Sequence, residues 1–89
     1  ENREDLTMIT GSNRVFEHDG REFHIQVEDL EQGDTLEVRV YDKGAVLFVK
    51  RVPYGEAVAG APEREDAIRA FMVKTIQTVS AAIAKGKIA

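Results

Sequence analysis

Apolar and polar residues alternate in four short stretches between Arg14 and Val52, and the spacing then changes to a helical period between Glu63 and Lys85. Alternation with period two places side chains on opposite faces of a β-strand, whereas apolar residues three and four positions apart share one face of a helix. This order predicts an α+β fold: a four-stranded antiparallel β-meander followed by one long C-terminal helix that packs on one face of the sheet.

The first hairpin can be placed in register from its turn. Asp19-Gly20 is a strong signal for a two-residue type I′ turn, because both central residues of that turn need positive φ. Pairing outward from it sets Phe16 against Phe23 and Val15 against His24. The two phenylalanines are then expected to face the core, and Val15 is expected to face away from it.

The turn between the third and fourth stretches fits a type I turn followed by a left-handed glycine bulge at Asp42-Lys43-Gly44. This turn would pair Val40 with Val46 and Val38 with Phe48. All four of these side chains are then expected to face the core.

The fourth stretch carries apolar residues on both of its faces. Strands of this kind are normally buried on both faces, yet the chain offers no second layer to cover the outward one. The outward face and the edge of this strand are therefore the candidate interaction surface. Its expected residues are Val15, Tyr41, Ala45, Leu47 and Val49.

The C-terminal stretch carries residues that usually begin and end a helix. Pro62 suits the first helical position, and Gly86 suits the C-terminal cap. The helix is expected to supply half of the core. That core comprises Phe16, Phe23, Ile25, Val38, Val40, Val46 and Phe48 from the sheet and Ile68, Phe71, Met72, Ile76, Val79 and Ile83 from the helix.

The length of 89 residues suits one small domain, with one sheet layer against one helix. Residues 1–12 lack a sustained period and are expected to form a flexible N-terminal arm, with Leu6–Ile9 as a possible added edge strand. Residues 13–89 are expected to form the single ββββα domain. Because the chain begins with Glu1 rather than Met, we expect it to be a module of a larger protein.

Composition and charge narrow the classes of function. The chain is 43% apolar and 31% charged, which is typical of a globular domain, and its net charge is −4. This charge repels nucleic acid and anionic membrane. The absence of cysteine excludes disulfides and thiolate metal sites. No apolar run approaches the roughly 20 residues of a membrane span, and there is no signal peptide, so a cytoplasmic location is expected.

Candidate chemistry is sparse. The segment Gly55–Gly60 is superficially like a phosphate-binding loop, but Ala61-Pro62 stands where a Lys-Ser or Lys-Thr pair is required, so a flexible connection is expected. His24 and Glu28 would share a strand face about 13 Å apart at roughly 3.3 Å per residue, too far apart to bind one metal ion by themselves. No catalytic, cofactor-binding or metal-binding residue is predicted, so we do not expect an enzyme.

The segment Phe23–Asp29, with the sequence FHIQVED, resembles a motif of small uncharacterised proteins and appended domains of myxobacteria and related deltaproteobacteria. The resemblance spans most of residues 14–88 and continues in Gly44–Leu47, in Lys50-Arg51 with Tyr54, and in Lys85–Ile88. In that family a glycine commonly follows the Glu-Asp pair after one residue, whereas three residues intervene before the glycine here. The resemblance implies one intact bacterial domain and carries no activity.

Two classes of function remain open. The first is a non-catalytic interaction domain that forms a homodimer or docks onto another protein through the outward apolar set. The alternative is a single-stranded nucleic-acid binder, because PUR-like and Whirly-like domains repeat the same ββββα order, although element order alone does not imply function. Such binders need aromatic residues among basic ones. The outward face offers Tyr41, Arg39 and Arg51, diluted by Glu17, Glu22, Glu28 and Glu37.

Overall fold

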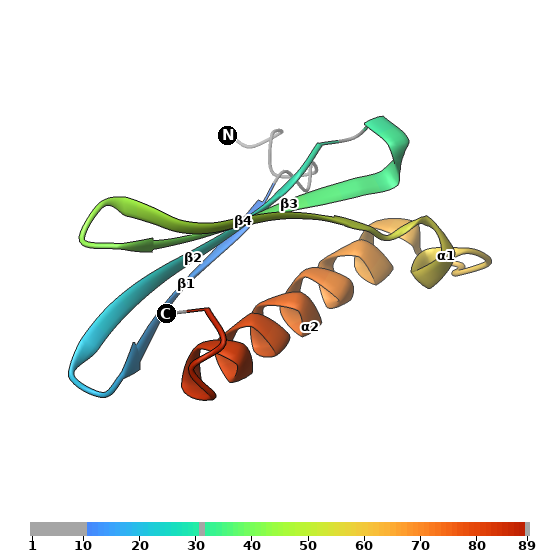
Figure 1. Ribbon diagram of the computed structural model, residues 1–89. Coiled ribbons are helices and arrows are strands. Elements are labelled where there is room, and N and C mark those ends of the chain that lie inside the picture. The colour runs from blue at the N-terminus through green and yellow to red at the C-terminus, as the bar shows by residue number, and fades with distance from the viewer. Residues whose placement is uncertain (1–10, 31, 89) are drawn as a thin grey trace, which may run out of the picture.

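A computed structural model describes residues 11–30 and 32–88 and confirms the predicted ββββα fold (Figure 1). The four strands are antiparallel in the order β1-β2-β3-β4, and α2 lies across one face of the sheet. The elements are β1 (Gly11–His18), β2 (Arg21–Asp29), a 3-10 turn (Gln32–Asp34), β3 (Thr35–Asp42), β4 (Ala45–Pro53), α1 (Gly55–Val58) and α2 (Arg64–Ala84).

The first strand begins earlier than expected. β1 starts at Gly11, so residues 11 and 12, assigned to the arm, belong to the sheet. The remainder of the predicted arm, including Leu6–Ile9, lies outside the described residues. The first hairpin has the predicted register, with Phe16 opposite Phe23 and Val15 opposite His24.

The second hairpin differs from the prediction. Lys43 and Gly44 both have positive φ, 54° and 84°, so the turn is a two-residue type I′ turn, whose twist matches that of the flanking strands. Val46 pairs with Tyr41, and the register then shifts so that Phe48 pairs with Val40.

The register shift makes Leu47 the extra residue of a β-bulge, since its neighbours on both sides are paired. Val46 shares the face of Tyr41, away from α2, and is 51% exposed. The predicted core position of Val46 is therefore wrong, as is its pairing with Val40. Val38 pairs with Lys50 rather than with Phe48.

The core lies between the sheet and α2. Its buried apolar residues are Phe23, Ile25, Val27, Leu36, Val38, Val40, Tyr54, Val58, Ile68, Met72, Ile76, Val79 and Ile83. Phe16, Phe48 and Phe71 are only partly buried against this cluster. The predicted core set lacked Val27, Leu36, Tyr54 and Val58. Val58 belongs to the Gly55–Gly60 connection that was expected to be flexible, and Tyr54 immediately precedes it.

That connection is ordered by a polar cluster around Tyr54. The Tyr54 hydroxyl donates to the Asp29 carboxylate, whose two oxygens lie 3.0 and 3.1 Å away. Arg64 pairs with Asp34 at 2.8 Å, and its guanidinium lies over the Tyr54 ring. The cluster therefore joins the end of β2, the start of β3, the end of β4 and the start of α2. Val58, on the single turn of α1, adds an apolar anchor to the same connection.

The pKa of the Tyr54 hydroxyl is raised above its ordinary value, first by burial and then by its hydrogen bond to the Asp29 carboxylate. Both causes act against the phenolate, because burial removes its hydration and the carboxylate repels its charge. The stability that depends on neutral Tyr54 is therefore fully present below about pH 10 and is lost as pH rises through the folded-state pKa.

We predict that a Tyr41→Phe protein, in which Tyr54 is the remaining tyrosine, ionises above the pH at which free tyrosine does. Ultraviolet absorbance of the phenolate against pH measures this. Denaturation series should show stability falling above about pH 10 in Tyr41→Phe and falling less in Tyr41→Phe with Tyr54→Phe. A Tyr54 that titrates like free tyrosine contradicts the burial and hydrogen bond described above.

We also predict that Met72→Ala lowers the free energy of unfolding by about 2–5 kcal/mol, because Met72 is 1% exposed between α2 and the sheet. Urea denaturation measures this loss. The matched control is Val73→Ala, one residue along the same helix and 39% exposed, which should change stability by no more than about 0.5 kcal/mol. Equal losses for the two variants would show that α2 packs on the sheet through another face.

Candidate interaction surface

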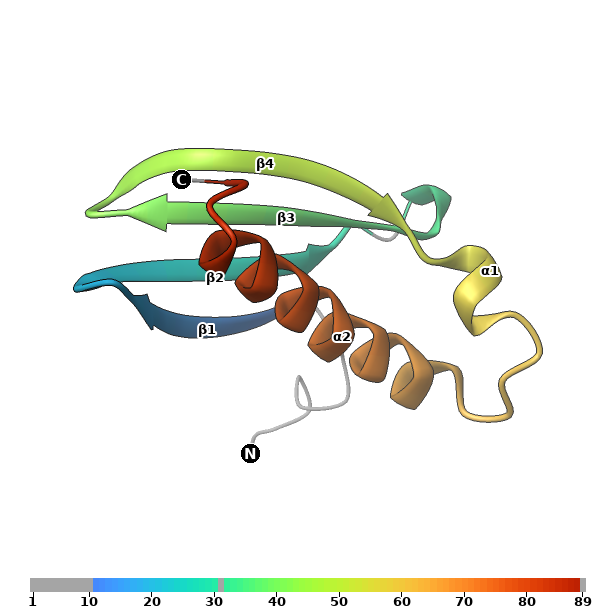
Figure 2. The ribbon, with the colours of Figure 1, turned by 60° about the horizontal axis from the view of Figure 1, so that its bottom comes forward.

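The face of the sheet opposite α2 is the candidate surface. Among the described residues, all of α1 and α2 lies on the other side or at the end of the sheet (Figure 2). Side chains that point outward from β1 to β4 therefore form one broad surface, here called the outer face.

One row of the outer face crosses all four strands. Val15 pairs with His24, His24 with Tyr41, and Tyr41 with Val46. Val15 and Val46 stand at the two ends of this row and are each 51% exposed, while Tyr41 is half-buried. The predicted residues Val15 and Tyr41 thus share a row, although Val15 lies on the far edge, about 14 Å from β4 across three strand spacings.

The other predicted residues lie on β4. Val49 pairs with Arg39 in the next row and is 51% exposed, and Leu47 is 39% exposed in the bulge. Ala45 is exposed beside the turn, but it pairs with Asp42, which itself pairs with the buried Phe23. Ala45 therefore lies on the α2 side of the sheet rather than on the outer face, where it was expected. Val46 completes this apolar cluster and was missed, because the sequence indicated the wrong turn type. The signal that could have found it is the Lys43-Gly44 dipeptide, which also fits a type I′ turn.

A buried carboxylate separates this apolar cluster from the charged end of the outer face. Glu37 is 9% exposed and forms ion pairs with Arg39 at 2.8 Å and Arg51 at 3.4 Å. The pKa of Arg39 is raised by hydrogen bonding with Tyr41 first and by the charge of Glu37 second. The two arginines expected as a basic site therefore share one carboxylate, and the three groups together carry a single positive charge.

Acidic side chains gather on the opposite half of the outer face. Glu17, Glu22 and Glu28 point outward from β1 and β2, and Glu22 lies 3.4 Å from the His24 imidazole. The outer face is therefore acidic over β1 and β2 and apolar with a weak positive charge over β3 and β4.

The edge of β4 is less open to strand pairing than the sequence indicated. β4 is an edge strand, as a meander requires. The bulge at Leu47 interrupts its regular backbone, Pro53 lacks an N–H group, and Lys50 and Arg51 add charge between them. Bulges, prolines and charged side chains are the usual protections of sheet edges, so the outer face is the better candidate for contact.

The two imidazoles lie on opposite faces of the sheet. His18 stacks on Phe16 at a centroid distance of 6.2 Å on the α2 side of the sheet, whereas His24 lies on the outer face. Across residues 11–30 and 32–88, no three side chains of the metal-binding types come together. Within the same residues, no helix has the length and apolar character needed to cross a membrane.

Comparison of the chain with models of protein families, with curated proteins and with solved structures gives no match. The resemblance of the FHIQVED segment to a myxobacterial domain family therefore stays a prediction.

Proposed function

We propose that this domain is a non-catalytic protein–protein interaction module that self-associates as a homodimer through its outer face. The observation that carries the proposal is the exposure of Val46, Leu47 and Val49 side by side on β4, next to Tyr41. Burial of apolar surface contributes about 25 cal/mol per Å² removed from water, so burying such a cluster in a protein contact is favourable.

A second copy of the chain suits this surface because the outer face is complementary to itself. A two-fold axis parallel to the strands lays β1 and β2 of one copy over β4 and β3 of the other. Val15 of one copy then approaches Val46 of the other, and the acidic half approaches the half that carries Arg39 and Arg51. A two-fold contact of this kind uses the same surface of both copies, so it joins two copies and does not propagate. The two sheets would pack face to face about 10 Å apart in the aligned arrangement.

We predict that Val46→Lys with Val49→Lys abolishes the dimer, because it places charges in the apolar cluster without touching the core. Sedimentation equilibrium over a concentration series measures the association. The matched control is Val73→Lys with Gln77→Lys, which places two charges on the exposed side of α2 and should leave the dimer intact. Circular dichroism checks that each variant is folded.

Two results would contradict the homodimer. One is a wild-type protein that is monomeric at high micromolar concentration. The other is a folded Val46→Lys, Val49→Lys protein that dimerises as strongly as the wild type, which would move the contact to another surface.

The nucleic-acid alternative makes a separate prediction. Since Arg39 and Arg51 share Glu37 and the outer face over β1 and β2 is acidic, the protein should bind single-stranded oligonucleotides weakly or not at all at physiological salt. Fluorescence anisotropy measures this binding. Glu37→Gln releases both arginines and serves as the variant in which weak binding should increase. Micromolar affinity of the wild type with steep salt dependence would favour the alternative.

A further inference from the structure

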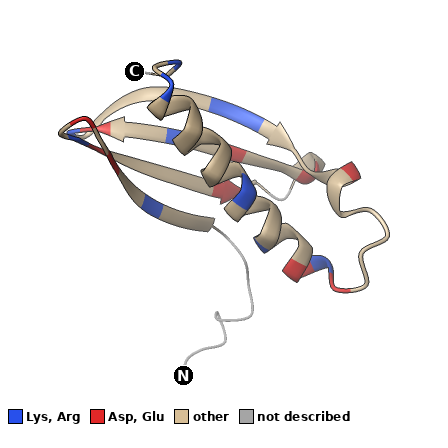
Figure 3. Cartoon of the chain, turned by 90° about the horizontal axis from the view of Figure 1, so that it is seen from below, with Lys and Arg blue, Asp and Glu red and all other residues tan. Residues whose placement is uncertain are grey.

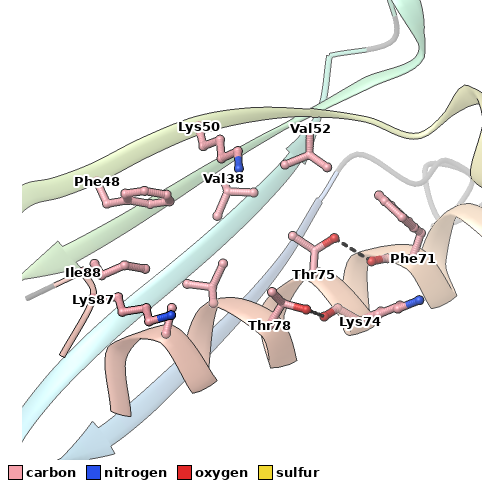
Figure 4. Close-up of a pocket in the computed structure, with 12 residues that line it drawn as sticks. Val38, Phe48, Lys50, Val52, Phe71, Lys74, Thr75, Thr78, Lys87 and Ile88 are labelled. Atoms are coloured by element: carbon pink, nitrogen blue, oxygen red, sulfur yellow. Dashed lines mark hydrogen bonds between the residues drawn. The ribbon is translucent and has the colours of Figure 1, made fainter. Parts of the chain in front are cut away.

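A groove lies on the α2 side of the sheet, away from the outer face. It runs between α2 and the inner face of β3 and β4, and its volume is about 420 Å³ (Figure 4). The groove exists because α2 crosses the sheet diagonally and lies closer to β1 and β2 than to β4. Gly86 then reverses the chain, so that Lys87 and Ile88 return toward β4 and line the groove as well.

The walls of the groove are apolar. Its apolar lining residues include Val38, Phe48, Val52, Phe71, Val79 and Ile88. The two hydroxyls in the lining are satisfied by the helix itself, since Thr75 Oγ1 donates to the Phe71 carbonyl at 2.8 Å and Thr78 Oγ1 donates to the Lys74 carbonyl at 3.0 Å. The walls therefore suit a hydrocarbon chain, which needs no hydrogen-bond partner.

The charged residues of the groove are all positive. They are Lys50, Lys74 and Lys87, and no acidic side chain of the described residues lines the groove. None of the three forms an ion pair with a described residue, although the whole chain carries 16 acidic residues against 12 basic ones. Figure 3 shows basic positions on β4, on α2 and near the C-terminal end. In Figure 4, Lys50 and Lys87 reach into the space between β4 and α2 from opposite sides.

We propose that this groove binds a single-chain amphiphilic carboxylate of the fatty-acid class. The hydrocarbon chain lies along Phe48, Val52 and Phe71, and the carboxylate lies between the ammonium groups of Lys50 and Lys87. The volume falls within the roughly 300–1,000 Å³ of small-molecule sites.

The proposed site does not depend on the homodimer, because the groove and the outer face lie on opposite sides of the sheet. The monomeric Val46→Lys, Val49→Lys protein should therefore bind the same ligand. Failure of dimerisation and failure of ligand binding are separate results.

Isothermal titration calorimetry with decanoate, dodecanoate and tetradecanoate, each below its micelle concentration, tests the proposal. Affinity should rise by up to about fourfold for each added methylene until the groove is filled. Dodecyltrimethylammonium, which has the same chain and a positive head group, should bind at least tenfold more weakly than dodecanoate. An absence of dodecanoate binding, or equal binding of the two amphiphiles, would overturn the proposal.

Variants locate the site. Lys50→Met with Lys87→Met keeps an unbranched side chain only one atom shorter at each position and removes both charges, and it should weaken dodecanoate binding at least tenfold. The matched control is Lys43→Met with Lys85→Met, two exposed lysines outside the groove, which should leave the affinity unchanged. Ala82→Phe should fill the groove and abolish binding with all three lysines in place. Equal affinities for the two lysine double variants would show that the carboxylate binds elsewhere, whether or not Ala82→Phe folds.

Discussion

One helix must cover a sheet of four strands, and the surfaces of this domain follow from that constraint. The axes of the two edge strands are about 14 Å apart at the usual strand spacing, whereas a helix with its side chains is about 10 Å wide. α2 therefore covers part of one face and none of the other. On the face that α2 covers, the helix is too narrow to reach the whole sheet and leaves the groove beside β4. On the other face, no described helix covers Val46 and Val49, which remain in contact with solvent.

β4, which the helix covers only in part, is also the strand with apolar residues on both faces. Phe48 and Val52 of β4 are half-buried on the inner side, and Val46 and Val49 are exposed on the outer side. A strand of this composition is usually buried on both faces. β4 therefore has apolar side chains without full cover on both of its faces. We propose that a second copy of the chain covers those on the outer face and that a hydrocarbon chain covers those in the groove.

The distribution of charge distinguishes these two surfaces. On the outer face, Glu37 is buried between Arg39 and Arg51, so positive charge there is largely compensated within the chain. In the groove, the lysines have no such partner among the described residues. An uncompensated positive groove in a chain of net charge −4 favours an anionic ligand, whereas the compensated outer face favours an apolar contact with a modest charge gradient.

Local periodicity was sufficient for much of this fold. The alternation between residues 14 and 52, the helical spacing after residue 63 and the Asp19-Gly20 turn determined the class of fold, the first register and most of the core. These features depend on residues close in sequence. The same patterns also indicated that β4 would expose apolar residues. Of the predicted interface residues, Val15, Leu47 and Val49 are exposed and Tyr41 is half-buried, whereas Ala45 is exposed on the α2 side instead.

Tertiary structure decided what depends on partners distant in sequence. Lys43-Gly44 fits two turn types, and only the pairing of β3 with β4 selects type I′, creates the bulge at Leu47 and turns Val46 outward. Tyr54 orders the last connection through Asp29, 25 residues earlier. The groove depends on the angle at which α2 crosses the sheet, which is set by the fit of many side chains at once and leaves no periodic signal in the sequence.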